Sequence, residues 1–155
     1  MAYAQNTQVS TDRSRAEIER TLQKYGADQF MYGWDQERAI IGFRLAGRQI
    51  KFILPMPSKQ DPEFTKTPTG KKRTEPAAYK EWEQACRAKW RSLSLVIKAK
   101  LEAVEAGIAI FEEEFMANIV LPNGGTVGQF MLPQITAAYE SGTMPKLLSD
   151  LNDKK

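Results

Sequence analysis

The longest regular pattern of apolar residues covers positions 74–106. Its apolar side chains recur at steps of three or four residues, and they are Trp82, Cys86, Trp90, Leu93, Ile97, Leu101 and Val104. That spacing lines one face of an α-helix and differs from the alternation of a strand. Thr74 suits the N-cap, Pro76 is tolerated in the first turn, and Gly107 supplies a stop. The pattern predicts a helix about 48 Å long.

Between positions 28 and 54 the apolar period changes to two. Alternating segments at 30–34, 39–45 and 50–54 predict three strands, and Gly47 supplies freedom for a tight turn between the last two. We expect an antiparallel meander with one apolar face against the long helix. The other face would carry Arg44 and Lys51 and could meet water or a ligand.

The segments on either side of this sheet predict less regular structure. Residues 1–13 are expected to be a loose arm, after which the capping-box pattern at 14–17 starts a short amphipathic helix that ends at Gly26. Residues 58–73 are polar and contain two prolines and a glycine. Such a long segment between elements favours a basic loop that is functional or disordered.

The last third of the chain predicts a smaller helical part. A helix to about position 117 would be followed by a short strand or extended link at 119–121 and a turn at 122–125. A second capping-box pattern at 126–129 starts another helix, which Pro133 would kink or restart, and a short final helix would begin at Met144. We therefore expect one α+β domain over residues 1–155.

Composition excludes several kinds of catalytic site. The chain has no histidine and only one cysteine, Cys86. These counts remove Ser-His-Asp and Cys-His catalysis, His-ligated zinc, Cys-rich zinc sites and intramolecular disulfides. The acidic run at 112–114 diverges around a helix, which favours a solvated turn over a metal site. No glycine-rich phosphate loop occurs, so we expect no cofactor, no metal and no catalytic residue.

Charge is distributed unevenly along the chain. Residues 1–37 hold four basic and six acidic side chains, residues 38–100 hold fifteen and five, and residues 101–155 hold three and eight. A basic middle between acidic ends points to an anionic partner. The candidate phosphate contacts are Arg44, Lys51, Lys71, Lys72, Arg73, Arg87, Arg91 and Lys98.

The same cations have a second explanation. They could form the solvated side of an amphipathic helix and sheet, paired with Glu75, Glu81 and Glu83. Exposed aromatic rings such as Tyr32, Trp34 and Tyr79 could stack on unpaired bases beside the cations. Because Trp82, Trp90 and Cys86 lie on the apolar stripe, core packing is the favoured role for them.

Six short segments resemble small proteins encoded in tailed-phage and prophage genomes. They are RAEIER at 15–20, YGAD at 25–28, IIGF at 40–43, ILPMP at 53–57, KAKLEAVEAG at 98–107 and FEEEF at 111–115. The resemblance transfers no functional residue. It implies a small accessory protein that acts in the cytoplasm of an infected bacterium, where it handles nucleic acid or interferes with host proteins.

These observations predict a non-catalytic nucleic-acid-binding protein, with DNA favoured over RNA as the partner. The basic loop and the long helix would contact the phosphate backbone. The alternative is a protein-interaction module that modulates a host protein such as a defence enzyme, with the acidic last block imitating nucleic acid. Neither a membrane span nor a signal peptide is expected. The long helix could also form a homo-oligomer along any apolar stripe that the sheet leaves uncovered.

Overall fold

The computed structural model describes the backbone of residues 2–144 and the side chains of residues 11–144. Its elements, in chain order, are α1 (Ala2–Lys24), β1 (Gln29–Trp34), β2 (Arg38–Leu45), β3 (Arg48–Pro55), α2 (Pro62–Thr65), α3 (Glu75–Glu105), α4 (Phe111–Glu114), the 3-10 helix η1 (Met116–Asn118) and α5 (Val127–Ser141). This arrangement confirms the α+β class, with a three-stranded antiparallel meander and a long helix. No helix in the part of the chain described is long and apolar enough to span a membrane.

The sheet has its strands in sequential order, with β2 in the centre. Its register pairs Phe43 of β2 with Phe30 on one side and Ile50 on the other. Ala46 and Gly47 join β2 to β3 with φ values of 49° and 74°. Two successive positive φ angles suit a two-residue turn whose twist matches the flanking strands.

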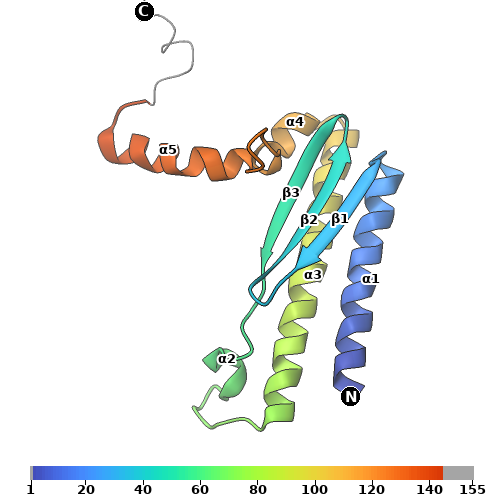
Figure 1. Cartoon of the computed structure of the whole chain (residues 1–155), viewed down its shortest axis with the longest axis vertical. Helices are drawn as coiled ribbons and strands as arrows, with labels where there is room; N and C mark the ends of the chain where they lie inside the picture. The colour runs from blue at the N-terminus through green and yellow to red at the C-terminus, as the bar shows by residue number, and fades with distance from the viewer. Residues whose placement is uncertain (1, 145–155) are drawn as a thin grey trace, which may run out of the picture.

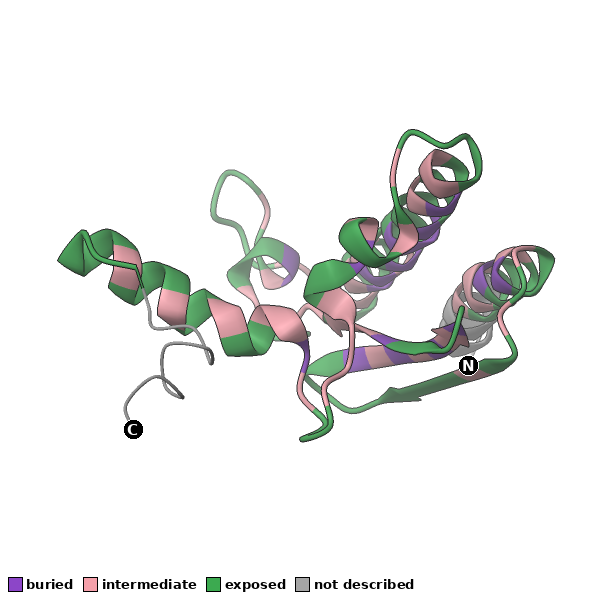
Figure 2. Ribbon diagram, turned by 90° about the horizontal axis from the view of Figure 1, so that it is seen from above, coloured by how far each residue is buried: buried purple, intermediate pink, exposed green. Residues whose placement is uncertain are grey.

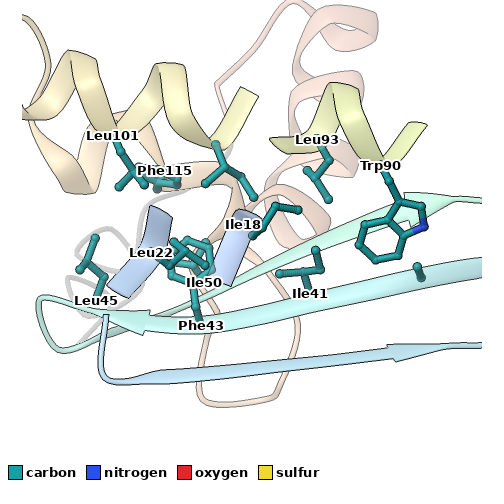
Figure 3. Packing of buried hydrophobic residues seen from close by; sticks show 12 residues of the cluster. Ile18, Leu22, Ile41, Phe43, Leu45, Ile50, Trp90, Leu93, Leu101 and Phe115 are labelled. Carbon is teal, nitrogen blue, oxygen red and sulfur yellow. The ribbon is translucent and has the colours of Figure 1, made fainter. Parts of the chain in front are cut away.

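Helices α1 and α3 cover one face of this sheet, and the other face stays open (Figure 2). Alternate residues of β2 are buried against the helices, as the period of two requires. Figure 3 shows these side chains meeting those of α1 and α3. The buried cluster consists of Ile18, Leu22, Ala39, Ile41, Phe43, Leu45, Ile50, Trp90, Leu93, Ile97, Leu101 and Phe115.

The long helix has the ends that its sequence predicted. The Thr74 hydroxyl accepts a hydrogen bond from the amide of Ala77 at 3.4 Å, and Gly107 follows the helix with a φ of 76°. At 31 residues α3 is about 46 Å long, whereas strands of eight residues reach only about 27 Å. The lower end of α3 therefore extends past the sheet, and α2 packs against it there (Figure 1).

The expected loose arm at residues 1–13 is wrong. The backbone is helical from Ala2, and the residues at 14–17 that resemble a capping box lie inside α1. No glycine or proline occurs between Ala2 and Tyr25, so nothing in that stretch stops a helix from extending toward the N-terminus.

The segment 58–73 is more regular than expected. It contains α2 and a small hairpin in which Lys66 and Lys72 form an antiparallel bridge. The amide of Thr67 donates to the carbonyl of Lys71 at 2.7 Å, and Gly70 supplies a φ of 89° at the turn. Local backbone hydrogen bonds order this segment, and an apolar period could not reveal them.

In the C-terminal part, the capping box at Thr126 and Gln129 is present and starts α5. The helix passes through Pro133 as one element and does not restart there, and it ends at Gly142 with a φ of 69°. The expected helix to about position 117 is instead α4 followed by η1. The final helix expected from Met144 lies outside the described residues.

Candidate nucleic-acid interface

Four cationic side chains share one side of α3, and we call this row the α3 flank: Lys80, Arg87, Arg91 and Lys98. They are separated by seven, four and seven residues, so each returns to about the same direction around the helix axis. The row is about 27 Å long at 1.5 Å per residue. Arg87 is half-buried and the other three side chains are exposed.

The α3 flank lies on the side of α3 that is near α1. Lys98 acts electrostatically on Tyr25, at the end of α1. Two other α3 side chains leave the helix on the opposite side: Lys100, which contacts α4, and Trp82, which contacts the segment before α2. Burial raises the pKa of Tyr25, Glu105 and Glu102 raise it further, and Lys98 opposes them. The Lys98 end of the flank therefore lies near two carboxylates, those of Glu102 and Glu105.

The flank cations are available to a ligand. None of the four lies within ion-pair distance of a carboxylate in the described part of the chain. Lys100, on the other side of α3, is in contrast held by Glu114, whose Oε1 lies 3.2 Å from Nζ and whose carbonyl oxygen lies 2.9 Å from it. Exposed cations without partners lose little when they neutralise phosphates.

The second basic group is the hairpin at residues 66–72, which we call the foot hairpin. Lys66, Lys71 and Lys72 are exposed on it. Arg73, which follows the hairpin, has a different role. Its Nη1 donates to the carbonyls of Glu63 at 2.8 Å and of the next residue at 3.1 Å, so it joins the hairpin to α2.

The two predicted residues on the sheet lie apart from the helix. Arg44 and Lys51 are on the open face, which is opposite to the face that α3 covers. Arg44 forms a two-pronged contact with Asp28, with Nη2 to Oδ2 at 2.6 Å and Nε to Oδ1 at 2.9 Å. This hydrogen bonding lowers the pKa of the Asp28 carboxyl. Lys51 donates to the carbonyl of Gly124 at 2.9 Å.

The aromatic residues do not form a row beside the α3 flank. Trp90 is buried, and Trp82 is half-buried with its Nε1 donating to the carbonyl of Pro57 at 2.8 Å. Lys59 lies 4.6 Å above the Trp82 ring. The exposed ring of Trp34 belongs to β1, at the edge of the sheet. The rings therefore lie at two separate places, which disfavours continuous stacking of bases.

The acidic run of α4 is largely occupied by the protein's own cations. Glu112 lies 3.7 Å from Arg48, and Glu114 holds Lys100. Because these ion pairs neutralise part of its negative charge, the acidic run of α4 is less suited to imitate nucleic acid. In the described ranges no three acidic, cysteine or histidine side chains form a group that could hold a metal ion. Burial raises the pKa of the Cys86 thiol to about 11, so it stays protonated at neutral pH.

Two residues were not singled out by the sequence as part of a site, Lys66 and Glu83. Lys66 joins the exposed cations of the foot hairpin. Lys80, which its spacing on the long helix already placed close to Arg87, Arg91 and Lys98, completes the α3 flank although it was not among the predicted contacts. Glu83 is buried at 2% exposure, and its Oε1 has no hydrogen-bond partner within the described region. Comparisons with protein-family models, with curated proteins and with solved structures find no match.

Proposed function

We propose that the protein is a non-catalytic nucleic-acid-binding accessory protein, phage-encoded and active in the bacterial cytoplasm, that contacts the phosphate backbone. The α3 flank is the main contact and the foot hairpin extends it. The observation that carries the proposal is the row of four cations on one rigid helix, with no ion-pair partner among the described residues. Because a rigid helix already fixes the spacing of the four backbone positions, binding needs to order only the side chains.

Duplex DNA suits this surface better than single strands. A rigid row about 27 Å long suits a stiff duplex, whose phosphates keep fixed positions, whereas single strands are usually held by stacking on aromatic rings. Each neutralised phosphate releases counterions. If four to six cations act in this way, log K should fall with log salt at a slope between about −3.6 and −5.4.

The test compares two cations on opposite sides of α3. Arg91 belongs to the flank, whereas Lys89 is also exposed but points about 160° away around the helix axis. Arg91→Gln should reduce the salt slope by about one unit and weaken binding to a short duplex, because one phosphate contact is lost. Lys89→Gln removes the same charge and should leave both quantities unchanged. Fluorescence anisotropy across a salt series measures them.

The two variants also separate specific binding from general attraction. Equal weakening by Arg91→Gln and Lys89→Gln would assign the binding to net charge alone and refute the flank as the contact surface. No binding of the unaltered protein to duplex or single-stranded nucleic acid at low salt would refute the proposed function as a whole.

A further inference from the structure

Helix α5 leaves the body of the molecule, and no other described segment covers its apolar side (Figure 1). None of its residues is buried, and its main contacts within the described chain are with η1. Leu132 is 63% exposed and Tyr139 is 87% exposed. We call the side formed by Met131, Leu132, Ile135, Ala138 and Tyr139 the α5 stripe. Glu140 is the one charged residue of α5 and lies outside this stripe.

An isolated helix of this kind gains too little to be stable alone. Fifteen residues are marginal for a helix in water, and α5 also contains a proline. Helices of this length are normally stabilised by packing of an apolar side. The α5 stripe therefore needs a surface to cover it.

The open face of the sheet carries such a surface. A groove of about 370 Å³ crosses the three strands, and we call it the outer groove. Its lining includes Met31, Gly33, Ile40, Gly42, Lys51 and Val120. Met31 is 68% exposed, so the apolar lining is open to solvent.

Two glycines give the outer groove its depth. Gly33 and Gly42 lie on the neighbouring strands β1 and β2, and neither has a positive φ. A Cβ atom at Gly33 would meet nothing within 4 Å, and one at Gly42 would meet only the carbonyl oxygen of Ile50 at 3.8 Å. Neither backbone strain nor crowding demands glycine there. Glycine inside a strand weakens the strand and is found where another segment approaches closely.

The α5 of the same chain does not occupy this groove. Val120 lines the groove, and α5 begins only a few residues later, after a turn at 121–125 that directs it away (Figure 2). The contacts that hold that turn include the amide of Leu121 to the carbonyl of Gly125 at 2.7 Å, Lys51 to Gly124, and the capping box at Thr126. Reversing α5 would break them.

We propose that α5 packs in the outer groove of a second copy of the chain, and that α5 of the second copy packs in the outer groove of the first. Reciprocal exchange about a two-fold axis closes after two copies. The stripe and the groove are both apolar, and the only charge on α5 stays outside the contact. A helix about 22 Å long and 10 Å wide gives a footprint of about 900 Å² over two arms and two grooves, which is below the roughly 1,200 Å² of stable specific interfaces, so the dimer should be weak and concentration-dependent.

The experiment measures mass by sedimentation over a range of concentrations for the full chain and three variants. Ile135→Glu places a charge in the α5 stripe, and Gly42→Val fills the outer groove with a residue that favours strands. Both should convert a dimer to a monomer with unchanged circular dichroism. Ala137→Glu places the same charge on the opposite, exposed side of α5 and should leave the dimer intact.

Mixing the two disruptive variants tests the exchange itself. Ile135→Glu keeps an intact groove and Gly42→Val keeps an intact arm, so the mixture should form a heterodimer through one arm, weaker than the original dimer. A monomeric unaltered chain at all concentrations overturns the proposal. So does a dimer that Ile135→Glu abolishes and Gly42→Val does not, because α5 would then pair with a surface other than the groove. Neither result bears on binding by the α3 flank.

Discussion

Single residues of this protein show that a charge in the sequence predicts neither exposure nor availability. Arg73 and Lys51 donate hydrogen bonds to backbone carbonyls, and Arg44 donates to the carboxylate of Asp28. Glu83 is the opposite case, because it is buried and one of its oxygens has no partner in the described structure. Burying a polar atom without a hydrogen bond costs about 1–3 kcal/mol.

That cost gives a stability prediction at the residue scale. Glu83→Met replaces the carboxylate by an unbranched apolar side chain of similar length. The free energy of unfolding in urea should rise by about 1–3 kcal/mol, because no unsatisfied oxygen remains. Glu81→Met, at an exposed position two residues away, should change it by less than about 0.5 kcal/mol. Destabilisation by Glu83→Met would mean that the carboxylate has a stabilising partner.

At the scale of elements, α3 carries two different surfaces around its axis, a buried apolar side and a cationic side. One side carries the buried stripe against the sheet and α1, and the flank beside it carries the free cations. The helix must be straight and stable for both, since the same turns hold core residues such as Ile97 and flank residues such as Lys98. Substitutions on the buried side should thus cost stability, and those on the exposed side should not.

The corresponding prediction compares two alanine substitutions in α3. Ile97 has no exposed surface, and Ile97→Ala should lower the free energy of unfolding by about 2–5 kcal/mol through lost burial and a residual cavity. Leu95 is 59% exposed, and Leu95→Ala should change it by less than about 0.5 kcal/mol. Denaturant unfolding measures both. Similar losses for the two would contradict the assignment of the buried side.

At the scale of the whole molecule, the basic residues do not merge into one surface. The α3 flank belongs to the helical layer, the foot hairpin lies at the end of α3 that passes the sheet, and Lys51 lies on the open face of the sheet (Figures 1 and 2). Two opposite faces cannot both contact one straight duplex. The proposed contact with nucleic acid is therefore expected at α3 and not at the sheet.

This separation predicts how a sheet cation contributes. Lys51→Gln should leave the affinity for duplex DNA within about twofold of the original and the salt slope unchanged, because no phosphate contact is removed. Arg91→Gln, measured beside it by anisotropy, should reduce both. A loss from Lys51→Gln as large as that from Arg91→Gln would indicate that the nucleic acid wraps around both faces.

Much of the fold was predictable because local spacing dictates it. The steps of three and four in α3, the alternation in β2 and the capping box at Thr126 each act within a few residues. The start of the first helix was predicted wrongly because a sequence pattern typical of helix starts lies inside a longer helix. The residues at 14–17 could have capped a helix, but the preceding turns of α1 already satisfy the backbone there.

The sequence by itself determined the three strands, the long helix α3 with its apolar side, and the row of cations spaced by seven and four residues. Only the tertiary structure decided which cations are free, because partners such as Gly124 for Lys51 and Asp28 for Arg44 lie far along the chain. It also decided that no described segment covers α5 or the open face of the sheet. Burial depends on contacts between distant segments, and no local period encodes those contacts.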